Sequence, residues 1–74
     1  MDVDKLVRMV NHIAANFEGG SDEGQAVADV TGHIQRFWSP LMRRQIVEHW
    51  RAQPGDLTPR AAQAIAAIDE QNDN

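Results

Sequence analysis

A serine–proline pair, Ser39-Pro40, interrupts the middle of the stretch from His33 to Trp50. Proline has no backbone N–H and disfavours helical geometry in the residue before it, so one helix cannot run through this pair. Proline is tolerated at the first position of a helix, and serine is a favoured N-cap. The pair therefore predicts two separate helices that meet at a sharp corner immediately after Trp38.

Apolar residues that recur every three or four positions predict the remaining helices of this 74-residue chain. A connector, "GGSDEG", ends the first helix with Gly19 and Gly20, and Ser21 or Asp22 can cap the second. Thr58-Pro59 repeats the cap-and-proline arrangement before the last helix. The expected helices span 2 to about 18, 21 or 22 to 38, 40 to 52, and 59 to about 70.

No strand pattern, internal repeat or heptad run is present. The predicted fold is therefore all-α: a small single-domain bundle of about four helices over residues 1–74, with a proline corner between helices two and three. Residues 70–74 are expected to form a frayed tail.

The second helix is expected to bury one apolar face. Gly32 lies in the middle of this helix but off the apolar stripe, where glycine costs about 1 kcal/mol relative to alanine. Either another backbone approaches closely there, or the glycine has no structural meaning. The residues expected on the apolar face are Val27, Val30, Ile34, Phe37 and Trp38.

Composition excludes several classes of function. The net charge of −4 argues against a nucleic-acid or anionic-membrane binder, since both need a basic surface. The absence of cysteine excludes disulfides, zinc–thiolate sites and iron–sulfur ligation by this chain. No segment has the roughly 20 apolar residues of a membrane span, and the acidic start lacks the apolar run of a signal peptide. We therefore expect a cytoplasmic protein.

No catalytic or metal-binding constellation is evident. The histidines His12, His33 and His49 lack the spacing of known metal motifs, and His33 is expected to pair with Asp29 four residues earlier. No nucleophile stands beside a plausible base, and the carboxylates are scattered over helix surfaces. The chain by itself is expected to be non-catalytic, with no cofactor or metal of its own.

Arg43 is the least easily explained charge. It falls on the same helical face as the apolar residues Met42, Ile46, Val47 and Trp50. A guanidinium there must extend to solvent, find a carboxylate or carbonyl, or meet a partner protein, because an unpaired buried charge is costly. The sequence leaves these alternatives open.

Two segments, "LVRMVNHIAANF" and "HIQRFWSPLMRRQI", resemble the small delta subunit of soluble NAD-dependent formate dehydrogenases. The similar features are an M-x-N-x-I-A-x-N-F helix, an H-I-x-x-F-W segment, a proline corner and an M-R pair. The family has aspartate where this chain has Ser39; both residues can cap a helix. The matching positions are Met9, Asn11, Ile13, Ala14, Asn16, Phe17, His33, Phe37, Trp38, Pro40, Met42 and Arg43.

The resemblance implies a non-catalytic accessory subunit of a cytoplasmic complex that converts formate and NAD to carbon dioxide and NADH. In that complex the large alpha subunit carries a molybdenum or tungsten bis-guanine-dinucleotide cofactor, and other subunits carry iron–sulfur clusters and FMN. The accessory subunit would bind the alpha subunit and support its assembly, cofactor loading or stability. The sequence does not distinguish molybdenum from tungsten, or a permanent subunit from an assembly factor.

We expect the docking surface at the corner between helices two and three and on the adjacent edge of helix one. Arginine, tryptophan and methionine are enriched at the centres of protein interfaces. The candidate interface residues are Met9, His12, Asn16, His33, Phe37, Trp38, Met42, Arg43 and Trp50.

Two alternatives belong to other functional classes. The corner between two helices, with Arg43, Arg44 and Arg51 nearby, could be a small helix-turn-helix DNA-binding motif, although the net charge opposes it. A self-associating helical bundle is the other alternative, because the last helix has a thin apolar face and the core is small.

Overall fold

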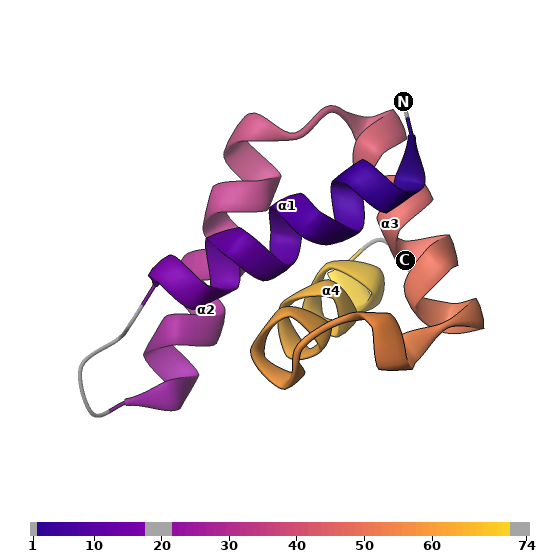
Figure 1. Ribbon diagram of the computed structural model, residues 1–74. Helices are drawn as coiled ribbons and strands as arrows, with labels where there is room; N and C mark the ends of the chain where they lie inside the picture. Colours follow the sequence, from indigo (N-terminus) through magenta and orange to yellow (C-terminus); the bar gives the residue numbers. More distant parts are fainter. Residues whose placement is uncertain (1, 18–21, 72–74) are drawn as a thin grey trace.

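The all-α prediction is confirmed. The computed structural model describes residues 2–17 and 22–71, and this part of the chain forms four α-helices and one 3-10 turn without strands (Figure 1). The helices are α1 (Val3–Asn16), α2 (Glu23–Phe37), α3 (Pro40–Ala52) and α4 (Pro59–Gln71), and the 3-10 turn is η1 (Pro54–Asp56).

Each α-helix begins at a short polar side chain that accepts a hydrogen bond from a backbone N–H of the first turn. The N···O distances lie between 3.0 and 3.4 Å. These bonds satisfy donors that the first turn otherwise leaves unpaired. The accepting residues are Asp2, Asp22, Ser39 and Thr58. The two proline-marked starts, and Asp22 of the two alternatives for α2, are confirmed.

The ends of α1 and α4 differ slightly from the predicted ends. α1 ends at Asn16 with Phe17 as its C-cap, and the expected glycine cap at 19 and 20 lies outside the described residues. α4 continues through Gln71, where the Gln35 and Gln71 side-chain amides are hydrogen-bonded. The first two residues of the expected tail are therefore helical, and 72–74 lie outside the described part.

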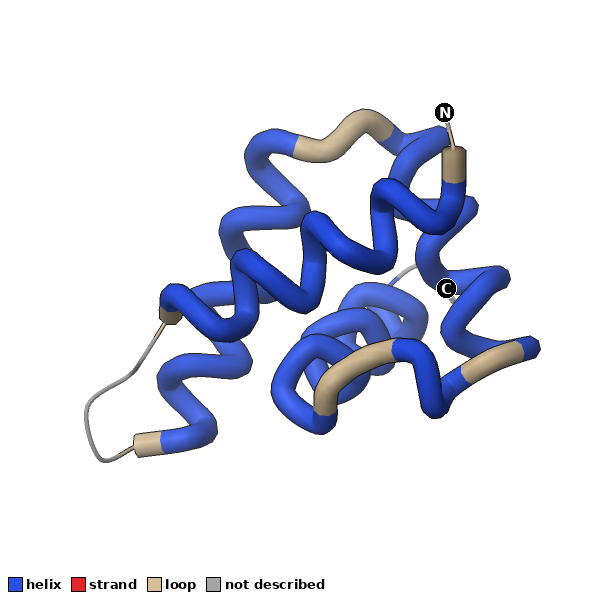
Figure 2. The backbone as a smooth tube through the Cα atoms, viewed as in Figure 1, coloured by secondary structure: helices blue, strands red, loops and turns tan. Residues whose placement is uncertain are grey.

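α4 packs against each of the other three helices. Figure 2 shows it beneath α1 and beside α3, while α1 crosses in front of α2. Ala61 and Ala64 of α4 are fully buried, and their small side chains leave room for a neighbouring helix to approach closely. The core residues are Leu6, Val10, Ala14, Val30, Ile34, Trp38, Ile46, Val47, Leu57, Ala61, Ala64, Ile65 and Ile68.

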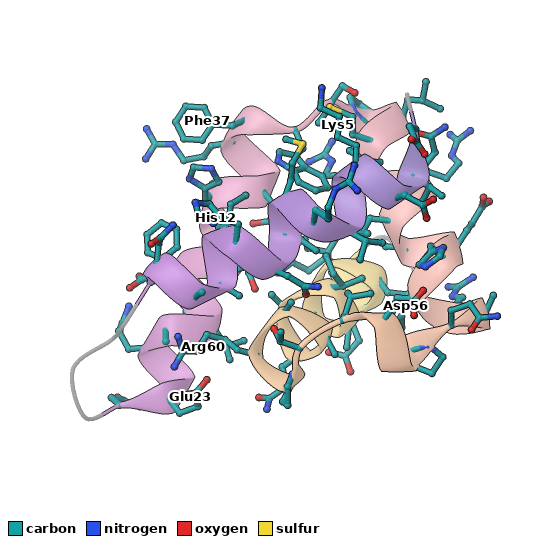
Figure 3. The ribbon with its side chains drawn as sticks, in the orientation of Figure 1. Lys5, His12, Glu23, Phe37, Asp56 and Arg60 are labelled. Atoms are coloured by element: carbon teal, nitrogen blue, oxygen red, sulfur yellow. The ribbon has the colours of Figure 1, made fainter. Side chains whose placement is uncertain are left out.

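The corner between α2 and α3 separates two neighbouring aromatic residues. Trp38 is the C-cap of α2, and its extended backbone (φ −92°, ψ 140°) leaves the helix; its side chain is 5% exposed and belongs to the core. Phe37 is 68% exposed, so its predicted place on the buried face is wrong. The last turn of α2 lies beyond α1, on the side away from α4 (Figure 1), and Figure 3 shows the Phe37 side chain at this end of the helix.

Gly32 lies inside α2 with open space around it. A Cβ built on this residue would meet no heavy atom of the described residues within 4 Å, so no backbone in that part of the chain requires a glycine there. We predict that Gly32→Ala stabilises the isolated chain by about 0.5–1 kcal/mol, because alanine is the better helix former. Urea denaturation followed by circular dichroism measures the change. A loss of stability would contradict the open environment of this position.

Candidate docking surface

A short row of aromatic rings crosses from the end of α1 to the end of α2. The His33 ring lies 5.6 Å from the Phe17 ring in an edge-to-face arrangement and 4.8 Å from the Phe37 ring (centroid distances). The Arg36 guanidinium carbon lies 5.9 Å from the Phe37 centroid, within the range of a cation–π contact. We call Phe17, His33 and Phe37 the aromatic row. The exposed Phe37 ring therefore has two neighbours within this chain, the His33 ring and the Arg36 guanidinium.

A hollow lies beside the aromatic row on the outer side of α2. Its lining includes Gly32, whose missing side chain deepens it, together with the three rings of the row. Arg36 and Asp29 supply its charged groups. We call this feature the Gly32 hollow.

The outer edge of α1 continues the candidate surface. Lys5, Met9, His12 and Asn16 follow one another at four- and three-residue steps and therefore share one side of the helix. Lys5, His12 and Asn16 are exposed, whereas Met9 packs partly against the core. Figure 3 shows Lys5, His12 and Phe37 on one side of the molecule, and Glu23, Asp56 and Arg60 toward the other side.

The remaining predicted interface residues lie in or against the core. Trp38 is buried, and Met42 and Trp50 are partly buried against the core. Arg43 is half-buried, and its Nη1 donates a hydrogen bond to the Gln35 carbonyl oxygen over 3.4 Å. Among the alternatives for Arg43, the structure shows the carbonyl contact, at the end of α2 where a cation is favourable.

The histidines have separate surroundings. Asp29 accepts a hydrogen bond from the Gln25 amide over 2.9 Å, so the predicted pair with His33 is replaced by two other contacts: Gln25 to Asp29, and His33 to the aromatic row. His49 Nε2 lies 2.8 Å from Asp56 Oδ2 and joins α3 to η1. Within residues 2–17 and 22–71, no three His, Asp or Glu side chains are gathered to hold a metal ion. None of the described helices is long and apolar enough to cross a membrane.

Comparison with known protein families gives a match over most of the chain. The family model of the NADH-dependent formate dehydrogenase delta subunit, FdsD, matches residues 5–65. The chain belongs to this family. The matched delta-subunit segment begins in the first turn of α1 and ends in the middle of α4, so it includes the corner, the aromatic row and the Gly32 hollow. No curated protein and no solved structure matches the chain significantly.

Asn11 connects two segments of the fold, and the sequence analysis did not predict this role. It belongs to the motif of the α1 helix, and it joins α1 to the segment before α4. Its Nδ2 donates to the Asp56 carbonyl oxygen over 3.1 Å, and its Oδ1 accepts from the Thr58 N–H over 2.9 Å. The Asn11 amide therefore both donates to and accepts from one loop, through its nitrogen and its oxygen. The presence of asparagine at position 11 is explained by these two hydrogen bonds within the fold.

Arg60 holds three helices together, and sequence reasoning missed it as well. Its Nη1 donates to the carbonyl oxygens of Ala14 (2.8 Å) and Phe17 (2.9 Å), at the end of α1. Its Nε and Nη2 bind the two Glu23 carboxylate oxygens in α2, over 2.7 and 2.9 Å. A cation in the first turn of a helix opposes the helix dipole. That conflict was the available signal that Arg60 binds acceptors on another element.

The Arg60 contact also perturbs the acidity of Glu23. The hydrogen bond from Arg60 and, to a smaller degree, its positive charge hold the pKa of Glu23 below the ordinary value of 4.5, against an opposing effect of desolvation. A carboxyl group whose pKa is lower in the folded than in the unfolded chain stabilises the fold above the unfolded pKa. That contribution is lost as the pH falls through the folded pKa.

We predict that Glu23→Gln lowers the stability of the isolated chain at pH 7. The difference in the free energy of unfolding between the variant and the unchanged chain should narrow as the pH falls below 4.5 and through the lowered pKa of Glu23. The native carboxyl group is then protonated and therefore uncharged, like the glutamine side chain. Urea denaturation at several pH values measures both curves. A gap that stays constant into the acidic range would show that Arg60 does not act on Glu23 through its charge.

Proposed function

We propose that this member of the delta-subunit family is a non-catalytic accessory subunit. It docks on the large alpha subunit of formate dehydrogenase and supports that subunit's assembly, cofactor loading or stability. In this proposal the molybdenum or tungsten cofactor, the iron–sulfur clusters and the FMN are held by other subunits, in the cytoplasm. The absence of cysteine supports this division, since this chain has no thiolate ligands for a cluster.

The single observation that supports docking most directly is the position of Phe37. It is 68% exposed at the end of α2, yet it contacts the His33 ring and lies within cation–π range of the Arg36 guanidinium. A large aromatic side chain that is already fixed loses little conformational entropy when a partner covers it. A protein that folds alone gains nothing from this arrangement, whereas a subunit gains an anchor.

We predict that Phe37→Ala weakens retention of the alpha subunit by about 30-fold, the effect of an interface anchor worth about 2 kcal/mol. The tagged chain is expressed in its native host, and the bound proteins are identified after a moderate salt wash. A shallow depression on α1 is lined by Lys5, Arg8, Met9 and His12. Leu41→Ala is the matched control, because Leu41 is 56% exposed and lines neither the Gly32 hollow nor this depression on α1. Equal losses from both variants would contradict the placement at Phe37.

The same experiment separates the other functional classes. Recovery of the unchanged chain alone, as a stable oligomer in sedimentation, would favour the self-associating bundle. Salt-dependent binding to random duplex DNA would favour the DNA-binding alternative. Recovery of the alpha subunit with the unchanged chain would support the accessory role.

A further inference from the structure

Gly32 carries a conformational cost that nothing within residues 2–17 and 22–71 explains. A glycine in a helix interior destabilises the helix relative to alanine, and here a Cβ would meet open space. The usual structural reasons for a glycine are a positive φ or a close internal contact, and neither is found at Gly32. A close approach from outside the chain is a physical reason that remains, at the place where Gly32 lines the hollow beside the aromatic row.

The charge around this surface differs from that of the whole chain. The chain has a net charge of −4, but the depression on α1 is lined by Lys5 and Arg8, and the Gly32 hollow by Arg36. Among the described residues that line these two features, Asp29 is the only carboxylate, and the Gln25 amide already donates to it over 2.9 Å. The Gly32 hollow itself contains one cation and one carboxylate, and the positive excess of the two features together comes from Lys5 and Arg8 on α1.

We propose that the Gly32 hollow and the aromatic row receive an acidic segment of the alpha subunit, which places an apolar side chain or its own backbone against Gly32. This inference rests on the proposed function and adds the chemistry of the partner's contact. The rings of the row supply the apolar contact, Gly32 permits the close approach, and Arg36, Lys5 and Arg8 face the carboxylates of the incoming segment. Charge complementarity of this kind steers association and fixes orientation.

The groove on α3 is a weaker candidate for an acidic partner. It is lined by Arg43, Arg44 and Arg51, but two of these side chains already have acceptors within the chain. Arg51 is paired with Asp69, and Arg43 donates to the Gln35 carbonyl oxygen. The groove also contains the carboxylate of Glu48. Two of its three arginines therefore already bind acceptors on α2 and α4.

The first test adds one methyl group to the hollow. Gly32→Ala is compared with Gly55→Ala, because Gly55 also has open space around it and lies in η1, away from the hollow. Retention of the alpha subunit on the tagged chain is measured beside the stability of each isolated variant. Gly32→Ala should stabilise the isolated chain and yet weaken retention about tenfold, because overpacking a close contact is unfavourable. Gly55→Ala should leave retention unchanged.

The second test addresses charge. Arg36→Glu is compared with Arg44→Glu, since both side chains are exposed and only Arg36 lies at the hollow. Arg36→Glu should weaken retention about tenfold in low salt, with a smaller difference in high salt, because salt screens exposed charges. Arg44→Glu should change retention less than twofold. Each isolated variant is checked by denaturation, so that a folding defect is not read as a docking defect.

The outcomes distinguish this inference from the proposed function. If Phe37→Ala loses the alpha subunit while Gly32→Ala retains it fully, or while Arg36→Glu behaves as Arg44→Glu does, the accessory role stands and this inference is overturned. If the unchanged chain fails to retain the alpha subunit, the proposed function falls, and this inference falls with it. Loss of retention in both Gly32→Ala and Arg36→Glu, with intact controls, supports the inference.

Discussion

Trp38→Ala should leave the isolated chain largely unfolded at room temperature. Trp38 is 5% exposed and lies in the core at the corner between α2 and α3. Replacing a buried tryptophan by alanine costs about 3–5 kcal/mol, because apolar contact is lost and a cavity remains. A core in a chain of this length rarely supplies more than about 3–5 kcal/mol, so the loss is comparable to the whole stability. Circular dichroism and urea denaturation measure the effect.

Phe37→Ala is the matched control for this prediction. It removes the neighbouring aromatic side chain, which is 68% exposed, and should cost less than about 1 kcal/mol. The two variants are also expected to fail differently in the complex: Trp38→Ala through loss of the fold, and Phe37→Ala through loss of docking by a folded chain. If Trp38→Ala unfolded cooperatively at the same urea concentration as the unchanged chain, that result would contradict the burial of this residue.

Arg60→Met should lower the stability of the chain by about 2–3 kcal/mol and the melting temperature by roughly 10–20 °C. The Arg60 side chain is 26% exposed and donates to two carbonyl oxygens at the end of α1 and to the Glu23 carboxylate. Methionine keeps most of the apolar stem, so the variant removes mainly the polar contacts. The carbonyl oxygens of Ala14 and Phe17 then lose a charged donor. Thermal and urea denaturation measure the change.

Glu23→Gln separates the two sides of the Arg60 contact. It weakens the exposed ion pair with α2 and leaves both hydrogen bonds to the end of α1, so it should cost clearly less than Arg60→Met. Equal costs for the two variants would place the contribution of Arg60 in its contact with Glu23. Neither substitution is expected to alter the aromatic row, which includes neither residue.

Local rules predicted the architecture well. The proline at position 40 acts on its immediate neighbours, and Ser39 and Thr58 bind N–H groups three residues away, so these features follow from short stretches of sequence. The buried residues of α4, including Ile65 and Ile68, likewise recur at three- and four-residue steps.

The errors arose where distant parts of the chain decide the environment. Periodicity places Phe37 with Val30 and Ile34, but it does not show that the last turn of α2 extends past its neighbours. Arg60 acts on acceptors 37 to 46 residues earlier, and the contacts of Asn11 span similar distances. No local pattern shows such partners.

The predicted docking residues divide for the same reason. The sequence indicated residue types that are common at interfaces, but it did not show which of them are buried in the core. Phe37, His12 and Asn16 are exposed, whereas Trp38 is buried and Trp50 packs partly against the core. Gly32 was noticed, but its open surroundings became apparent only in three dimensions.

The Arg60 contact also orders events during synthesis. Ala14, whose carbonyl oxygen binds the Arg60 guanidinium, precedes Arg60 by 46 residues. The two loop partners of Asn11 follow it by 45 and 47 residues. A nascent chain that ends before α4 has α1, α2, α3 and both loop partners of Asn11, but it lacks the Arg60 contacts. Short helices without full tertiary packing are marginal in water. Long-range contacts of this kind form late, since chain closure must precede them. The end of α1 therefore gains its bonds from Arg60 only after the last helix has been synthesised.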